Sequence, residues 1–226
     1  MRALTRALKD SDAKVRYHAA TALGAIGPGA LVAVPSLIEA MAEPPGSGSS
    51  QLDTGRDPAC AAARALGAVV KGPRPPKVAI RALTDTLRSE HLWRRGSAAE
   101  GLYTIGPGAS QAVPSLVGAL REQIATGQRL DRGSWIPMAL GVLAPGSESP
   151  APAVAALTDA LDSTSPDMKR EAARALGGFG PAAAAAVPRL SAAIDDPNRD
   201  VAQAARSSLA QIRDNVHPHI PRTLPD

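Results

Sequence analysis

Apolar side chains recur along the chain at helical spacing, in pairs of short segments separated by glycine and proline. In the first pair, five apolar positions fall on one face of a helix: Val15, Ala19, Ala22, Leu23 and Ile26. After a break at Gly27-Pro28-Gly29, four more share one face of a second helix: Val34, Leu37, Ile38 and Met41. Since this spacing is typical of amphipathic helices, the pattern predicts a unit made of a helix, a turn and a second helix.

The same unit returns along the chain. Each first helix carries a repeated leucine near its end, at Leu23, Leu66, Leu102, Leu140, Leu176 and Leu209. These repeated leucines are separated by 43, 36, 38, 36 and 33 residues. The second helix has its own motif, Ala-Val-Pro-x-Leu, at 33–37 and 112–116, and a close copy at 186–190. Its proline fits the first turn of a helix, which has no internal N–H bond to lose. A recurring period of this length indicates a repeat protein.

Stacked two-helix units form a solenoid, in which each unit contacts only its neighbours. We predict an all-α fold, an α-solenoid (right-handed superhelix) of about five helical hairpins plus a half repeat at each end. Residues 3–9 align with the second helices around Leu83 and Leu157, so the chain begins in the middle of a unit. The predicted domains are the solenoid at 1–214, with a flexible insertion loop at 43–57, and a Pro-rich tail at 215–226.

Both ends of the predicted stack are half repeats, whereas a solenoid normally carries polar caps on its terminal units. We therefore expect either further repeats upstream of Met1 or a partner that covers the N-terminal end. An upstream reading frame that encodes another repeat would favour the first of these two explanations.

Residues that cap helices precede several of the predicted first helices. Asp12, Asp57, Ser165 and Asp196-Pro197-Asn198 can accept hydrogen bonds from the free N–H groups of a helix start. Three prolines fit the first helical position: Pro58, Pro166 and Pro197. In the fourth unit Pro137 falls inside the first helix, so it should kink that helix or delay its start. The glycines after the first helices fit the left-handed backbone of a helix exit.

The amino-acid composition limits which residues can form the core and which classes of protein are possible. Aromatic residues make up only 2% of the chain, so the buried volume has to come from alanine, leucine, valine and isoleucine, and small side chains let helices approach closely. The single cysteine, Cys60, excludes a disulfide within one chain and falls in an alanine-rich helical run, where we expect it to pack as a small apolar residue. No uninterrupted apolar run reaches the length of a membrane span, and the first residues lack a secretory signal. We expect a cytoplasmic protein without a membrane partner.

The repeated motifs resemble HEAT repeats, and most closely the short bacterial variety also found in phycobilisome lyases. The resemblance rests on Asp12-Ala13-Lys14-Val15-Arg16 opening a helix, Ala-Leu-Gly closing it, and Gly-Pro followed by Ala-Val-Pro-x-Leu. It implies that the Asp and Arg of the opening phrase tie neighbouring units together. Asp12 and Arg16 match that phrase, Lys169 and Arg170 match it loosely, and the second and fourth units depart from it. Arrays of this kind serve as binding surfaces in many settings.

We predict a non-enzymatic protein-protein interaction scaffold that binds another protein on the face formed by its second helices. These helices line the inner face in HEAT arrays, and the residues to test are Glu39, Arg81, Asp85, Arg88, Arg121, Glu122, Asp159 and Arg189. We predict no catalytic residues, no cofactor and no metal site. His217 and His219 form a His-x-His pair, but no Cys, Asp or Glu cluster lies near them in the sequence.

Two alternative functions remain open. A phycobilin-lyase-like chromophore-binding protein would use the few aromatic residues, Trp93, Tyr103 and Trp135, with Asp131 as the nearest acid to Trp135. A nucleic-acid-binding array would use the cations of the central units: Lys71, Arg74, Lys77, Arg81, Arg94, Arg95, Arg129 and Arg132. The net charge of +4 is a mild basic bias, and the predicted second helices mix both signs, which favours a protein partner.

Overall fold

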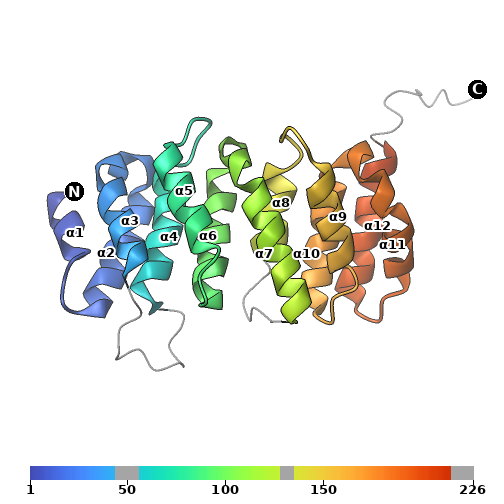
Figure 1. Ribbon diagram of the computed structural model, residues 1–226, viewed down its shortest axis with the longest axis horizontal. Helices are drawn as coiled ribbons and strands as arrows, with labels where there is room; N and C mark the ends of the chain where they lie inside the picture. The colour runs from blue at the N-terminus through green and yellow to red at the C-terminus, as the bar shows by residue number, and fades with distance from the viewer. Residues whose placement is uncertain (44–55, 128–134, 215–226) are drawn as a thin grey trace, which may run out of the picture.

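The computed structural model describes residues 1–43, 56–127 and 135–214, and these form helices stacked in sequence order, without strands (Figure 1). Most of the predicted loop at 43–57 and the whole of the predicted tail at 215–226 lie outside the described residues. Within the described part, the predicted all-α solenoid of five hairpins between two half repeats is confirmed.

Two layers of helices alternate along the chain. The first helices are α2 (Ala13–Ile26), α4 (Pro58–Val69), α6 (Leu92–Ile105), α8 (Trp135–Leu143), α10 (Pro166–Gly177) and α12 (Arg199–Asp214). The second helices are α1 (Arg2–Ala7), α3 (Val34–Ala42), α5 (Lys77–Thr86), α7 (Val113–Thr126), α9 (Ala151–Ala160) and α11 (Val187–Ala192). The 3₁₀ turns η1 (Gly27–Ala33), η3 (Pro107–Ala112) and η4 (Gly180–Ala186) join three of the hairpins, and η5 (Ala193–Asp195) follows α11. The repeated leucines are all buried between the layers.

The helix starts follow the sequence signals closely. Asp12 and Asp57 cap α2 and α4 by accepting hydrogen bonds from the backbone N–H groups of Lys14 and Ala59. Ser165 caps α10 in the same way. The prediction for Pro197 was wrong, because the side chain of Asn198 is the cap of α12 and the helix begins one residue later.

Prolines lie near the described starts of two first helices. Pro137 is the third residue of α8 (Trp135–Leu143), and because residues 128–134 lie outside the described residues, the delayed start expected of this helix stays a prediction. Pro58 is the first residue of α4.

Glycines hold adjacent first helices at very short distances. The glycine after the repeated leucine lies inside the helix at Gly24, Gly67, Gly141 and Gly177. A Cβ atom added at Gly67 would lie 2.5 Å from the Cα of Gly101 in α6, and one added at Gly141 would lie 2.9 Å from the Cα of Ala175 in α10. These glycines therefore allow backbone-to-backbone packing, a role that the sequence pattern did not predict. The predicted left-handed helix exits are also present, for example at Gly27 and Gly106 with φ of 64° and 81°.

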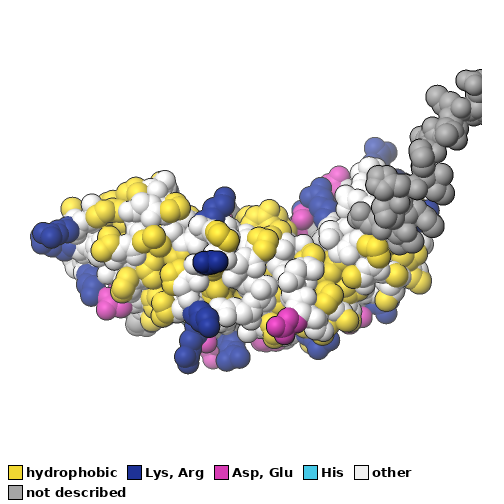
Figure 2. Space-filling model, turned by 90° about the horizontal axis from the view of Figure 1, so that it is seen from above, with side chains coloured by type: hydrophobic (Ala, Val, Ile, Leu, Met, Phe, Trp, Pro, Cys, Tyr) yellow, Lys and Arg dark blue, Asp and Glu magenta, His cyan; other side chains and the backbone are white. Residues whose placement is uncertain are grey.

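Because of this packing, the first helices lie closest together and form the more closely packed edge of the stack. The second helices lie farther apart, and a cavity of about 420 Å³ opens between α3 and α5, against about 230 Å³ between α2 and α4. The stack bows gently as a result (Figure 2). Because the more closely packed layer must form the shorter edge, the second helices occupy the splayed, outer edge. The expectation that they line an inner surface was wrong for this reason.

Two apolar positions of the first unit are exposed rather than buried. Val15 and Ile26 in α2 are 38% and 46% exposed, although the sequence pattern placed them with the core residues Ala19 and Leu23. Their helical face is apolar as predicted, but α2 has no first helix before it among the described residues.

One stretch of the described chain, Ala13–Ala42, is long and apolar enough by composition to cross a membrane, in contrast to the expectation from the sequence. It consists of α2, η1 and α3, with a positive φ at Gly27 where α2 ends. Leu23, Leu37 and Ala33 within it are fully buried in the stack. The stretch is therefore a helical hairpin of the solenoid and not one continuous helix.

The glycine contacts lead to a testable expectation for stability. Replacing Gly67 with Ala inserts a methyl group against the backbone of α6, and overpacking of this kind costs about 1–3 kcal/mol. Gly118, in the exposed middle of α7, has no atom within 4 Å of an added Cβ, so Gly118→Ala should stabilise by about 0.5–1 kcal/mol. Urea unfolding of both variants measures the difference, and equal effects would contradict the close contact.

Candidate functional site

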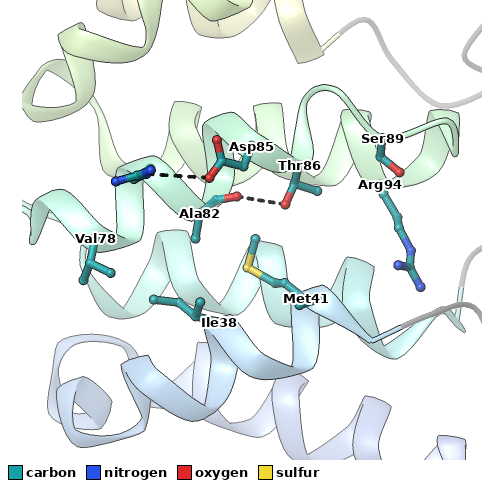
Figure 3. Close-up of a pocket in the computed structure, with 10 residues that line it drawn as sticks. Ile38, Met41, Val78, Ala82, Asp85, Thr86, Ser89 and Arg94 are labelled. Atoms are coloured by element: carbon teal, nitrogen blue, oxygen red, sulfur yellow. Dashed lines mark hydrogen bonds and ion pairs between the residues drawn. The ribbon is translucent and has the colours of Figure 1, made fainter.

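A groove between the second helices α3 and α5 is the candidate site (Figure 3). Its volume is about 420 Å³. It is lined by Ile38, Met41 and Ala42 from α3, by Val78, Arg81, Ala82, Asp85 and Thr86 from α5, and by Ser89 and Arg94 at one end. Pockets of this size, walled by apolar side chains with a few polar groups, are typical of sites that take a ligand or an anchoring side chain.

The walls of the groove are apolar and its rim is charged. Ile38 and Met41 project from α3 toward α5, and Val78 faces them from the start of α5 with 57% of its surface exposed. The Thr86 hydroxyl donates a hydrogen bond to the Ala82 carbonyl at 2.9 Å, so its polar atom is satisfied within α5. On the rim, Arg81 and Asp85 approach within 3.9 Å one helical turn apart.

Arg94 closes one end of the groove and clamps three units together. Its Nε lies 2.7 Å from Oδ2 of Asp57, the cap of α4, and its Nη1 donates to the Glu43 carbonyl at 2.8 Å, directly after α3. Only 9% of the Arg94 side chain is exposed. A buried guanidinium needs such partners, because an unpaired charge is costly to bury. The contact therefore holds the groove in shape.

The single cysteine lies beside this clamp. The Sγ of Cys60 is 3.7 Å from Oδ2 of Asp57. Burial, and secondarily the negative charge of Asp57, raise the pKa of the Cys60 thiol to about 11. Almost no thiolate exists at neutral pH under these conditions, so Cys60 is a packing residue in the folded chain.

The predicted partner-binding residues are all exposed, and most of them already pair with charges of the same chain. Glu39 on α3 pairs with Lys9 at 2.6 Å, and Glu122 on α7 pairs with Arg95 of α6 at 2.9 Å. Arg189 on α11 approaches Asp159 on α9 at 3.4 Å and also pairs with Asp162. Several of these pairs join neighbouring second helices along the stack.

Two cations of the predicted face differ from the rest. Within the described ranges, Arg88 and Arg121 form no ion pair. Arg88 follows the end of α5 and is not part of the helix, and Arg121 lies on α7. The structure thus brings Arg81 and Asp85 together at the groove, and distributes the other six residues along the stack.

Some of the residues proposed for the two alternative functions have structural roles, and others are exposed. The rings of Tyr103 and Trp135 pack together with centroids 5.6 Å apart and lie against the core, joining α6 to α8. Arg94 is buried and Arg95 is paired with Glu122, so neither belongs to an open cationic stripe. Trp93 is partly buried, and Lys71, Arg74 and Lys77 are exposed. Asp131, Arg129 and Arg132 lie outside the described residues.

Across residues 1–43, 56–127 and 135–214, no three His, Cys, Asp or Glu side chains gather to hold a metal ion. The histidine pair His217 and His219 lies outside these ranges. The described groups thus give no donor set for metal chemistry.

Two protein-family descriptions match this chain, one at each end of the stack. The HEAT repeat family matches residues 1–30, and a second family description, HEAT repeats, matches residues 143–223. The chain is a HEAT-repeat protein. No curated protein matches it.

Solved structures with the same fold cover nearly the whole HEAT array. An engineered protein is 24% identical with a TM-score of 0.59, covering 94% of this chain and 96% of its own. The complex of CpcE and CpcF of phycocyanin lyase from Nostoc sp. PCC7120 is 22% identical with a TM-score of 0.63, covering 92% and 75%. A designed armadillo repeat protein in complex with the peptide (KR)4 is 16% identical with a TM-score of 0.62, covering 93% and 98%. At these identities the likeness shows the fold.

The charged ties between HEAT units differ from those that the resemblance implied. Asp12 caps its own helix, and Arg16 pairs with Glu43 at 3.1 Å inside the first unit. On the first-helix side, ties between units are made by Asp57 with Arg94 and by Lys169 with Asp196. The second unit, which departs from the expected phrase, therefore contributes one of them. The separation of Asp57 and Arg94 by 37 residues, close to the repeat period, is the sequence signal that could have revealed it.

Breaking the clamp should lower stability. Arg94→Met leaves the Asp57 carboxylate partly buried without its partner, and we expect a cost of about 1–3 kcal/mol. Adding Asp57→Asn, which keeps a capping oxygen, should cost less than the two single changes together. The control is Arg81→Met in the exposed pair with Asp85, expected to change stability by less than about 0.5 kcal/mol. Equal losses for Arg94→Met and Arg81→Met in urea unfolding would argue against the clamp.

The ion pair between Lys169 and Asp196, near the C-terminal end of the stack, predicts that the stability of the fold depends on pH. The hydrogen bond from Lys169, and secondarily the Asn198 backbone N–H, lower the pKa of Asp196 in the folded state. A lowered pKa contributes stability that is present above the unfolded pKa of Asp, near 3.9, and is lost as the pH falls through the lower folded value. Asp196→Asn should therefore lose stability near neutral pH and show a shallower decline in acid. Parallel acid profiles for the two proteins in thermal unfolding would contradict this.

Proposed function

We propose that this HEAT-repeat protein is a non-enzymatic scaffold that binds a partner protein on its second-helix face, with the groove between α3 and α5 as the anchoring pocket. The observation that carries the proposal is the groove itself, an apolar slot between two second helices with Arg81 and Asp85 on its rim. HEAT arrays generally mediate protein binding, which supports the class of function.

The side chains of the groove indicate which residues the bound segment of the partner should carry. Large apolar side chains in a desolvated pocket supply most of the affinity of a protein interface, and charges around it set specificity and association rate. Ile38, Met41 and Val78 form the apolar part here. Arg88 carries a charge without an ion pair in the described chain, and Arg81 is 84% exposed in its loose pair with Asp85. The expected ligand is an apolar residue flanked by Asp or Glu.

The structural neighbours support this mode of binding. A designed armadillo repeat protein of the same fold is held in complex with the basic peptide (KR)4, and CpcE forms a complex with CpcF. We propose the opposite charge preference for this chain because the side chain of Arg81 is 84% exposed on the rim of the groove. We also propose a cytoplasmic location, based on the single cysteine of the sequence.

Selection from a random peptide display library tests the proposal and requires no identified partner. We expect enriched peptides with one large apolar residue next to acidic residues. Val78→Glu should weaken binding of a selected peptide at least tenfold, because it places a charge in the apolar slot. Val32→Glu is the matched control, since Val32 is 71% exposed on η1 and does not line the groove.

Charge reversal separates the two parts of the site. Replacing Arg81, Arg88 and Arg121 with Glu should weaken an acidic ligand and leave the fold intact, since all three side chains are exposed. Leu102→Asp should instead unfold the array, because Leu102 is fully buried. Binding that is indifferent to both Val78→Glu and the triple reversal would exclude the groove as the partner site.

A further inference from the structure

Three exposed apolar side chains occupy equivalent positions in the first two hairpins. Leu31 is 51% exposed, Val32 71% and Val78 57%. The motif of the second helices sets the register, since residues 33–37 align with residues 79–83. Val32 and Val78 both stand directly before the alanine of that motif, and Leu31 aligns with Lys77. The two hairpins therefore present apolar side chains to solvent at one repeated position.

The later units show that the fold does not need an apolar side chain at this position. In units three to five the residue equivalent to Val32 is Gln111, Pro152 or Ala185, and each is exposed although its unit has neighbours on both sides. Stacking therefore leaves the position open to solvent. The alanine that follows it is instead fully buried in every unit: Ala33, Ala79, Ala112, Ala153 and Ala186.

The turns that join first to second helices lie side by side along one edge of the stack (Figure 1). A Cβ atom added at Gly27, where η1 begins, would lie 3.8 Å from the carbonyl oxygen of Ala68 in α4, so the first turn contacts the second unit. We call residues 27–33 and 71–78 the turn edge. It combines the exposed apolar residues of η1 with the connection from α4 to α5.

The turn edge is basic and contains no acid. Its three cations, Lys71, Arg74 and Lys77, are exposed and form no ion pair with the described part of the chain. No Asp or Glu occurs anywhere in residues 13–38 or 58–84. Figure 2 looks down on this edge, and its left half shows hydrophobic side chains with Lys and Arg among them, whereas acidic side chains appear there only near the outline. The edge therefore suits a negatively charged surface.

We propose that the turn edge binds the surface of an anionic lipid bilayer, with Leu31 and Val32 inserted among the headgroups and the three cations against the headgroup charges. Such a surface presents negative charge outside and apolar chains just beneath, which matches protruding apolar side chains beside unpaired cations. The contact is peripheral and needs no membrane-spanning segment. It differs from the sequence-based expectation of no membrane partner, which rested on the lack of a spanning run.

The shape of the turn edge favours a bilayer over a protein or a nucleic acid. Leu31 and Val32 line neither the groove between α3 and α5 nor the smaller cavity between α2 and α4. A protein partner gains most of its affinity from side chains held in pockets, whereas a bilayer accepts apolar side chains that protrude from a turn. Nucleic acid is bound through phosphates and base stacking, which gives Leu31 and Val32 no role.

Co-sedimentation of the full chain with phosphatidylcholine vesicles, with and without about one-third phosphatidylserine, tests the proposal. We expect binding to the anionic vesicles, and weaker binding to neutral ones or at about 0.5 M salt. Leu31→Ser with Val32→Gln, which installs the residues of unit three, should weaken binding about tenfold or more. Lys71→Glu with Arg74→Glu should weaken it by at least about as much. No binding to anionic vesicles, or binding that ignores the change at Leu31 and Val32, would overturn the proposal.

Control variants separate the turn edge from the rest of the surface and from the groove. Ala184→Ser with Ala185→Gln makes the matching change at the turn of unit five and should leave vesicle binding unaltered; an equal loss there would overturn the assignment. Val32→Glu should abolish vesicle binding yet keep a peptide selected on the groove, so the two proposals can fail independently. A selected peptide that needs Val32 but not Val78, without vesicle binding, would assign the edge to a protein and overturn the lipid proposal.

A fluorescent label at position 32 distinguishes insertion from adsorption. An environment-sensitive fluorophore on Val32→Cys should shift to the blue on anionic vesicles, because the side chain leaves water. The same label on Ala185→Cys should not shift. Cys60 is only 1% exposed and should stay unlabelled in the folded chain. An unshifted emission from the vesicle-bound Val32→Cys variant would overturn the proposed insertion.

Discussion

The backbone contact between adjacent first helices is the constraint from which the rest of the structure follows. Gly67 and Gly141 bring α4 and α8 against the backbones of their successors with no room for a Cβ atom, and Gly24 and Gly177 make similarly tight contacts with the next first helix. One edge of the stack is thereby closed, and the second helices on the other edge are left with space between them. The groove between α3 and α5 is one consequence of that asymmetry, and Arg94 fixes its end by joining Glu43, Asp57 and α6.

The junction between α6 and α8 differs from the other junctions between first helices. At the glycine position α6 carries Tyr103, whose ring packs on Trp135. An aromatic pair lies between the two helices where the other junctions use glycine against glycine, alanine or serine. Two of the very few aromatic residues of the chain are thus needed where the repeat pattern changes, which explains their presence without a chromophore.

Local patterns predicted the helices because the causes of helix formation are local. The repeated leucines, the caps at Asp12 and Asp57, and the prolines of the second helices act within a few residues of where they stand. The contacts between units were not predictable in the same way. Gly67 meets Gly101 and Asp57 meets Arg94 across more than 30 residues, so the sequence around either residue does not indicate its partner. The groove was missed for the same reason, since its width depends on packing in the opposite layer.

A stack with one closed edge can bend in only one sense. The first-helix edge cannot shorten further, because its backbones already touch at Gly67 and Gly141. Where the backbones touch, the deformation that remains is a fan-like opening or closing of the second helices. Opening or closing the groove between α3 and α5 would therefore also change the angle between the first two units, and with it the direction in which the units on either side point.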